Sequence, residues 1–123
     1  MPAYNFKSRF APKVESGEKR QTIRKRRKFG NAAPGKPLQL YTGQRTKACR
    51  KLVDPDPECK SVHPIKITRY LAFGAVFVGG KKLTYLETFN LAHDDGFSST
   101  VDFFHFFAPD PGDVFDDAVL IKW

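Results

Sequence analysis

Three polar side chains in one short segment have the chemical types and the spacing of a reactive site. Lys19, Thr22 and Arg24 lie within residues 17–24, which read Gly-Glu-Lys-Arg-Gln-Thr-Ile-Arg. Thr22 and Arg24 are two residues apart on an expected strand, so they share the face opposite to Ile23. An ammonium, a hydroxyl and a guanidinium that converge on one cleft can bind a phosphate, a carbonyl or the edge of a base.

Lys19 can also activate the threonine of this segment. A lysine buried beside other cations has a lowered pKa, because burial and like charges both disfavour the ammonium form. The neutral amine of Lys19 could then take the proton of the Thr22 hydroxyl and make that oxygen a nucleophile. Two simpler interpretations stay open: Lys19 as a solvated side chain and Thr22 as an ordinary strand residue.

The same segment resembles the G-x-K-x-x-T-x-R signature of the ASCH family, a branch of the PUA-like β-barrel superfamily. Two further stretches are similar to that family: residues 34–41, a proline-glycine step before a strand, and residues 92–97, an acidic-glycine step between two late helices. A final strand such as residues 119–123 completes the family's order of elements. The resemblance implies a mixed α+β fold, a small PUA-like β-barrel with two or three short helices, as one domain over residues 1–123.

The resemblance also implies an activity and the residues for it. ASCH proteins include amidohydrolases that deacylate a modified cytidine, in which the motif lysine and threonine work with an acidic residue from the late helical region. Carried over to this chain, the catalytic residues are Lys19, Thr22 and Asp95. Those enzymes have glutamate where this chain offers Asp95, which is one methylene shorter. Asp94 is a competing candidate and Glu87 lies nearby. Other members of the family bind or cleave RNA.

Charge is distributed unevenly along the chain. The formal net charge is +8, but residues 1–82 hold 20 basic and 5 acidic residues (+15), and residues 83–123 hold 1 and 8 (−7). Residues 19–53 contain no acid at all. Such a density of cations attracts polyanions, because neutralised phosphates release counterions. We therefore expect RNA, or a nucleotide or nucleoside, as the partner; a solvated basic face is the simpler alternative.

The residues expected to contact nucleic acid are cations of this acid-free segment and one aromatic side chain among them. They are Arg24, Lys25, Arg26, Arg27, Lys28, Tyr41, Arg45 and Lys47. The tyrosine ends an expected strand and is the candidate for stacking on a base. The expected function is an RNA- or nucleotide-binding ASCH-type domain with a basic cleft. The alternative is a hydrolase that uses a Lys-Thr-acid site, on an N4-acylated cytidine or on RNA.

The remaining chemically capable residues carry weaker signals. Cys49, Cys59 and His63 have the spacing C-x9-C-x3-H, but a structural zinc site usually has four ligands and a tighter cysteine pair. We therefore expect neither a metal nor a cofactor. His93 is expected at the surface of the loop between the late helices, with a place in the same cleft as Lys19 as the alternative. His105, which lies among phenylalanines, is expected in the core.

The elements that must position these side chains are short. Period-two alternation and turn signals predict strands over residues 4–10, 22–25, 38–42, 48–53, 61–69, 75–78, 81–85 and 119–123. Helices are predicted over residues 11–16, 86–92 and 98–107. Ser98 or Ser99 is predicted to cap the last helix, with Asp102 three residues after Ser99. The apolar face of this helix should hold Val101, Phe104 and Phe107.

Composition sets the broad class. Hydrophobic residues make up 41% of 123 residues, which excludes global disorder and suits one domain. No apolar run approaches the ~18–20 residues of a membrane span, and residues 1–10 contain no apolar leader core. These features predict a cytoplasmic protein with reduced cysteines and no membrane partner.

Overall fold

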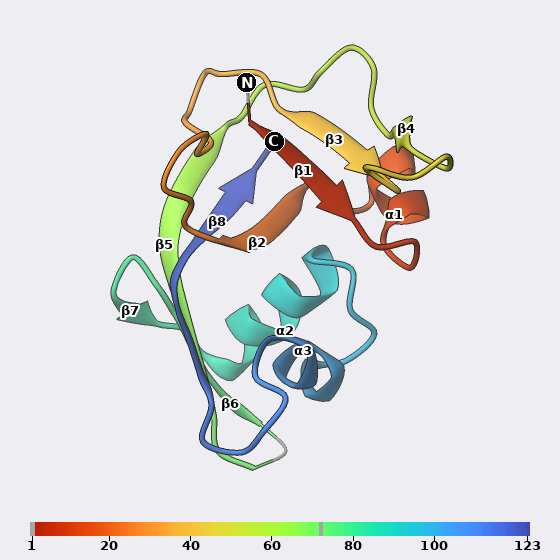
Figure 1. Ribbon diagram of the computed structural model, residues 1–123. Helices are drawn as coiled ribbons and strands as arrows, with labels where there is room; N and C mark the ends of the chain where they lie inside the picture. The colour runs from red at the N-terminus through yellow and green to blue at the C-terminus, as the bar shows by residue number, and fades with distance from the viewer. Residues whose placement is uncertain (1, 72) are drawn as a thin grey trace.

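Two β-sheets and three helices make up the part of the chain that the computed structural model describes, residues 2–71 and 73–123 (Figure 1). The three-stranded sheet has the order β1-β3-β4, formed by Ala3–Phe6, Gln39–Thr42 and Arg50–Lys51. The five-stranded sheet has the order β2-β8-β5-β6-β7, formed by Gln21–Lys25, Val114–Lys122, Ser61–Arg69, Gly74–Val78 and Lys81–Lys82. The helices are α1 (Ala11–Ser16), α2 (Tyr85–Asp94) and α3 (Thr100–Phe107). The expected mixed α+β class is confirmed.

The two sheets place their edge strands β1 and β2 at the site. β1 pairs in parallel with β3 and has its other edge open, while β2 pairs antiparallel with β8, with Thr22 opposite Ile121. β8 also pairs with β5, so the last strand of the chain joins β2 to the rest of its sheet. In Figure 1, β1 and β2 lie in the upper half of the molecule, above the helices α2 and α3.

Three expected strands are shorter in the structure than expected, two of them for an identifiable local reason. The first strand ends at Phe6 instead of residue 10, because the amide of Phe10 turns back to the Lys7 carbonyl at 2.9 Å. The expected strand 81–85 stops at Lys82, because Thr84 begins a helix. The expected strand 48–53 shortens to Arg50–Lys51.

The last strand starts five residues earlier than expected, at Val114. Its register against β5 shifts between Ile65 and Ile67, at a bulge where Asp117 adopts a left-handed backbone with φ of 49°. The two acidic residues at positions 116 and 117 interrupt the apolar run at this bulge. Their polarity is what concealed the first half of the strand in the sequence.

Side-chain caps fix where the late helices begin. The Thr84 hydroxyl accepts from the Glu87 amide at 3.2 Å while the Glu87 carboxylate accepts from the Thr84 amide at 2.9 Å, a capping box that starts α2. The Ser99 hydroxyl accepts from the Asp102 amide at 3.1 Å, which confirms the expected cap of α3. Both helices therefore start at defined residues beside the edge of the five-stranded sheet.

Phenylalanines form the part of the core that supports the site. The Phe97 ring packs edge-on against Phe10, Phe103 and Phe106, with centroids 5.2, 5.4 and 5.3 Å away. Because Phe97 follows α2 and Phe10 precedes α1, this packing holds the end of α2 against the start of α1. Such edge-to-face pairs add to the free energy gained by burial.

One face of the last helix differs from expectation. Phe103 and Phe104 are buried, as the phenylalanine-rich pattern predicts, but Val101 and His105 are exposed. These two residues are four positions apart and so share one side of the helix, which faces away from the core. His105 instead lies with its Nε2 atom 3.3 Å from Nη2 of Arg69.

None of the helices in the described part of the chain has the length and apolarity that a membrane crossing requires.

Candidate functional site

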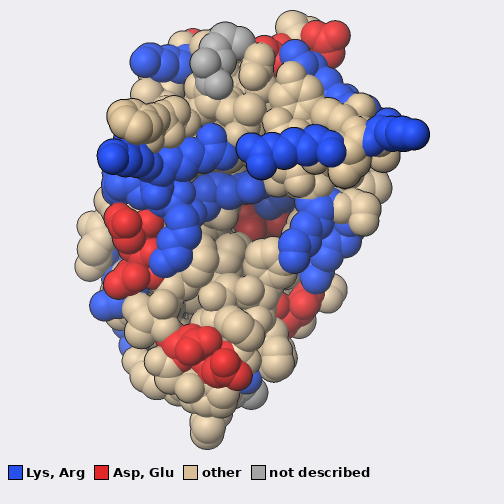
Figure 2. Space-filling model, in the orientation of Figure 1, with Lys and Arg blue, Asp and Glu red and all other residues tan. Residues whose placement is uncertain are grey.

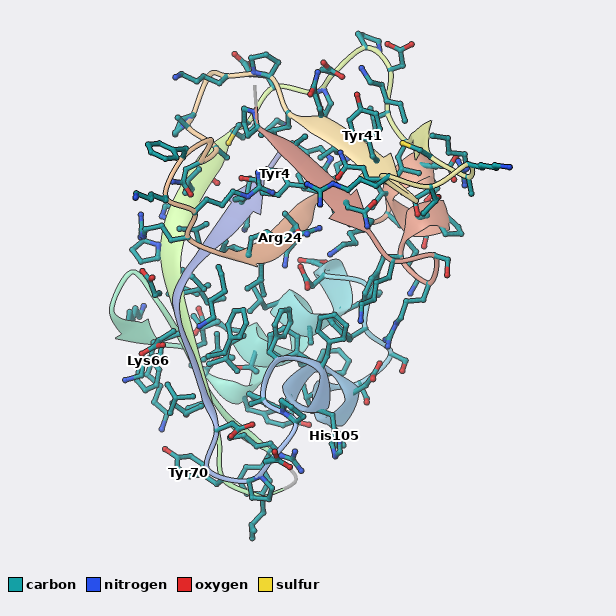
Figure 3. The ribbon with its side chains drawn as sticks, viewed as in Figure 1. Tyr4, Arg24, Tyr41, Lys66, Tyr70 and His105 are labelled. Carbon is teal, nitrogen blue, oxygen red and sulfur yellow. The ribbon has the colours of Figure 1, made fainter. Side chains whose placement is uncertain are left out.

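Lys19, Thr22, Arg24 and Asp95 line one pocket of about 290 Å³. They come from three places in the chain: the turn after α1, strand β2 and the end of α2. Figure 3 shows Arg24 on β2, with Tyr4 on the side of β1 and the helices below. Eight further residues complete the pocket wall, from β1, β2, α3 and the segments beside α1 and α2: Asn5, Phe6, Lys7, Phe10, Ile23, Phe97, Phe106 and Phe107.

A buried ion pair forms part of the wall of this pocket. The ammonium of Lys19 donates to the backbone carbonyl of Asp95 at 2.7 Å and lies 3.1 Å from its Oδ1 atom. Both side chains are 3% exposed. The side-chain Nε2 atom of Gln21 donates to the same Oδ1 of Asp95 at 3.2 Å and to the backbone carbonyl of Leu91 at 3.3 Å. The carboxylate is therefore held from two sides.

Burial sets the protonation chemistry of this pair. It lowers the pKa of Lys19 and raises the pKa of Asp95, because each charged form is separated from water; the opposite charge of the partner works against both shifts. The two pKa values are thereby brought toward each other. Perturbed pKa values in a buried, charged pair that lines a pocket make Lys19 and Asp95 a candidate acid-base pair.

The chain can make the contact because a glycine follows the acid. Gly96 has a left-handed backbone with φ of 97°, and a Cβ atom there would lie 3.0 Å from the Phe10 ring and 3.4 Å from Cδ of Lys19. The Asp-Gly step therefore turns the chain sharply and lets the backbone lie close over the lysine stem.

Thr22 and Arg24 form the second polar wall. The guanidinium of Arg24 donates through Nε to the Thr22 hydroxyl oxygen at 2.9 Å and through Nη2 to the Asn5 carbonyl at 2.7 Å. Burial, followed by the charge of Arg27, lowers the pKa of Arg24 to about 10, so the group remains a cation at neutral pH. Thr22 Oγ1 accepts the hydrogen bond from Arg24 Nε, so the hydroxyl proton of Thr22 points away from Arg24. The adjacent guanidinium favours negative charge on this oxygen.

Of the three acids considered from sequence, one reaches the pocket. Asp95 lines it, whereas Asp94 is exposed and lines a different cavity beside Glu18 and Arg20. Glu87 is engaged in the cap of α2. The position next to Lys19 therefore belongs to Asp95.

The dense basic run does not converge on the pocket as a unit. Lys25 and Arg26 lie 3.8 and 3.5 Å from the carboxylates of Asp116 and Asp117 on the neighbouring strand β8. The acidic C-terminal part thus complements part of the basic part within the fold. Figure 2 shows Lys and Arg side chains as a band across this face of the molecule.

The other expected nucleic-acid contacts lie outside the pocket lining. Arg27 is exposed, with its guanidinium 4.2 Å from the centre of the Tyr4 ring, and Lys28 is exposed next to it. Tyr41 is half-buried on β3, and Arg45 and Lys47 are exposed in the segment after that strand.

Two polar residues of the site were missed from sequence: Gln21, which holds Asp95, and Asn5, whose carbonyl holds Arg24. Gln21 stands inside the motif segment, so its position offered a weak signal. No sequence signal marks Asn5, because its contribution is a backbone oxygen at the open edge of β1.

The remaining candidates have no comparable site. Cys49 is exposed and Cys59 is buried, both as free thiols, and no group of three or more metal-ligating side chains occurs in residues 2–71 and 73–123. His93 lies in the last turn of α2 and not in a loop; it is exposed beside a cavity of about 280 Å³ that Lys19 does not line. A larger cavity of about 510 Å³ lies between β6, β7 and the late helices, and its wall is mostly apolar, with Lys82 as its charged residue.

Comparisons of the chain with protein-family models, with curated proteins and with solved structures found no match.

Proposed function

We propose that this chain is a PUA-like domain of ASCH type whose pocket binds a nucleotide or nucleoside, free or as a unit of RNA. The observation that carries this proposal is the meeting of motif residues Lys19, Thr22 and Arg24 with Asp95 in one pocket. Hydrogen-bond donors and acceptors at fixed positions within an aromatic wall are what the edge and the face of a base require.

The size of the pocket supports a single unit as the ligand. A volume of about 290 Å³ lies at the lower end for small-molecule sites, and it suits one nucleoside better than a strand. The spread of the basic residues agrees with this, because Lys25 and Arg26 are paired with acids on β8 and are not directed into the pocket. RNA would then bind through one inserted unit.

Amide chemical shifts measured during titration with cytidine, uridine, cytidine monophosphate and a short RNA test this proposal. We expect saturable shifts at Lys19, Thr22, Arg24 and Gly96. Thr22→Val should weaken binding, and Thr68→Val, on β5 outside the pocket lining, is the matched control. Shifts confined to the surface around Arg45, or no saturation with any of the ligands, would contradict it.

A second candidate function is favoured by the buried Lys19–Asp95 pair, which lines the same pocket as Thr22. It is removal of the acyl group from an N4-acylated cytidine. Thr22 Oγ1 would attack the acyl carbon while the neutral amine of Lys19 takes the hydroxyl proton. The C–N4 bond would then break, with Asp95 supplying the proton to the leaving cytidine nitrogen. Water would hydrolyse the acyl-threonine ester and release the carboxylic acid.

Incubation with N4-acetylcytidine and with short RNAs, for the parent and for Thr22→Ala, decides this second function. We expect the parent to release cytidine, and the variant to lose that activity. Thr68→Ala controls for the loss of a strand threonine. Equal turnover in parent and Thr22→Ala would remove Thr22 as the nucleophile, and no turnover by the folded parent would reject hydrolysis while the titrations decide binding.

A further inference from the structure

Two arginines are fixed side by side on the open edge of β1. The Nη2 atoms of Arg24 and Arg27 donate to the carbonyls of Asn5 and Ala3, each at 2.7 Å. These carbonyls are two residues apart, so they point to the same edge of the strand. That edge is the one opposite to β3, since the Pro2 carbonyl accepts from β3.

One buried ring lies near both guanidinium groups. The centre of the Tyr4 ring lies 5.4 Å from Cζ of Arg24 and 4.2 Å from Cζ of Arg27. Tyr4 is 2% exposed, and its hydroxyl accepts from the Ala32 amide at 3.2 Å, so the ring is a rigid support. The two arginine side chains are therefore largely ordered before a ligand binds, which lowers the entropy cost of binding.

Neither guanidinium has a carboxylate within 4 Å among the described residues. The neighbouring Lys25 and Arg26 are paired with acids of β8, but Arg24 and Arg27 take part in no ion pair in that part of the chain. The carboxylate that lines the pocket, Asp95, is already paired with Lys19. Two adjacent like charges at the rim of a pocket are unfavourable until an anion binds between or beside them.

We propose that Arg24 and Arg27 bind a terminal phosphate, so that the preferred ligand of the pocket is a nucleoside monophosphate and not the neutral nucleoside. This inference rests on the proposed function, which places the base in the pocket. Guanidinium groups bind phosphate oxygens through paired N–H donors. A phosphate monoester is close to a dianion at neutral pH, which matches two cations. The same phosphate can belong to a free nucleotide or to the end of an RNA.

Calorimetric titration with cytidine and with cytidine monophosphate tests the phosphate site. We expect the monophosphate to bind about tenfold to a hundredfold more tightly, the range of charge-assisted hydrogen bonds. Arg27→Ala should remove most of that ratio and leave the cytidine affinity unchanged, since Arg27 does not line the pocket. Arg20→Ala is the matched control. It removes the same charge from an exposed residue whose guanidinium donates to the Gly17 carbonyl, and it should keep the ratio.

Two further arms identify the source and the charge of the phosphate. Affinity for the monophosphate should rise as the pH increases through about 6, where the monoester loses its second proton, and affinity for cytidine should not change in parallel. A short RNA with a 5′-phosphate, compared with the same RNA carrying a 5′-hydroxyl, reports whether an RNA end can supply the group.

The outcomes separate this inference from the proposed function. Equal affinities for cytidine and its monophosphate would overturn the phosphate site and leave the base pocket standing. Tight binding of inorganic phosphate and of the monophosphate, without any binding of cytidine, would support the arginine pair and reject the base pocket. Equal losses in Arg27→Ala and Arg20→Ala, with both variants folded by their melting curves, would reduce the effect to overall charge and overturn the inference.

Discussion

The ammonium of Lys19 reaches both the backbone carbonyl and the carboxylate of Asp95, at 2.7 and 3.1 Å, although 75 residues lie between them in the chain. Both groups are buried, and separating two charges from water costs several kcal/mol each, by order of magnitude. An apolar pair of similar size would often stabilise a fold as well or better. The presence of this pair is therefore weak evidence for a contribution to stability.

Lys19→Met should destabilise the protein strongly, because it leaves the Asp95 carboxylate buried without its cation. We expect the free energy of unfolding to fall by about 3–5 kcal/mol. The double variant Lys19→Met, Asp95→Leu should recover most of this loss, because it removes the unpaired charge as well. Urea denaturation of the parent and the variants gives both values, and a double variant no more stable than the single one would contradict the assignment.

The stability of Lys19→Met should also depend on pH in a defined direction. Burial raises the pKa of Asp95 in the folded protein, and the variant lacks the ammonium that opposes this shift. The destabilisation caused by the unpaired Asp95 carboxylate is therefore fully present above the pKa of Asp95 in the folded variant. It is absent below the pKa of an aspartate in the unfolded chain, about 3.9. The free energy of unfolding of the variant should fall, relative to the parent, as the pH rises through that window. A difference that is constant with pH would show that Asp95 does not titrate in it.

Gly96→Ala should disturb the pocket and the fold together. The new methyl group would need a left-handed backbone and would meet the Phe10 ring at 3.0 Å. We expect a loss of more than about 1 kcal/mol in the free energy of unfolding, with changed amide shifts at Lys19 and Asp95. Gly112→Ala is a useful control, because its φ of 88° is also left-handed but nothing lies within 4 Å of the added atom. Equal losses in both variants would assign the effect to the backbone alone.

Replacements of Thr22 should separate its hydroxyl from its shape. Thr22→Val keeps the volume but leaves the Nε–H of Arg24 without its acceptor, a change of about 1–3 kcal/mol in the free energy of unfolding. Thr22→Ser keeps the oxygen and should retain ligand binding and any deacylation. The measurements are urea denaturation and release of cytidine from N4-acetylcytidine. Equal stability of the serine and valine variants would contradict the role given to this hydrogen bond.

Ser99→Ala should weaken the start of α3, because the Asp102 amide loses its acceptor. The expected change in the free energy of unfolding is about 1 kcal/mol. Ser98→Ala is the matched control, since Ser98 is exposed and precedes the cap position. Thermal denaturation of both variants measures the difference, and a larger effect at Ser98 would place the cap one residue earlier.

Local chemistry in the sequence was sufficient for several elements. Ser99 and Asp102 predicted the start of α3 because a cap involves residues only three positions apart. The turn residues at positions 54–57 likewise predicted a strand over residues 61–69 after them, which are the observed bounds of β5. Where a distant partner decides the conformation, the prediction was wrong: the bulge at Asp117 opposite β5 extends the last strand, and the outward side of α3 exposes His105.

The candidate site likewise has a part that local sequence determines and a part that distant contacts determine. The types and spacing of Lys19, Thr22 and Arg24 are properties of the sequence, because one turn and one strand carry all three. The choice of Asp95 over Asp94 was decided by the tertiary structure. The packing of Phe97 on Phe10 and the turn at Gly96 bring the end of α2 to Lys19.

The tertiary structure also decided which cations of the basic run are paired with acids within the fold. Pairing of β2 with β8 gives Lys25 and Arg26 acidic neighbours, while the open edge of β1 aligns Arg24 with Arg27. Strand pairing joins residues that are distant in the chain, so no local pattern of charge could determine which cations remain available to a ligand.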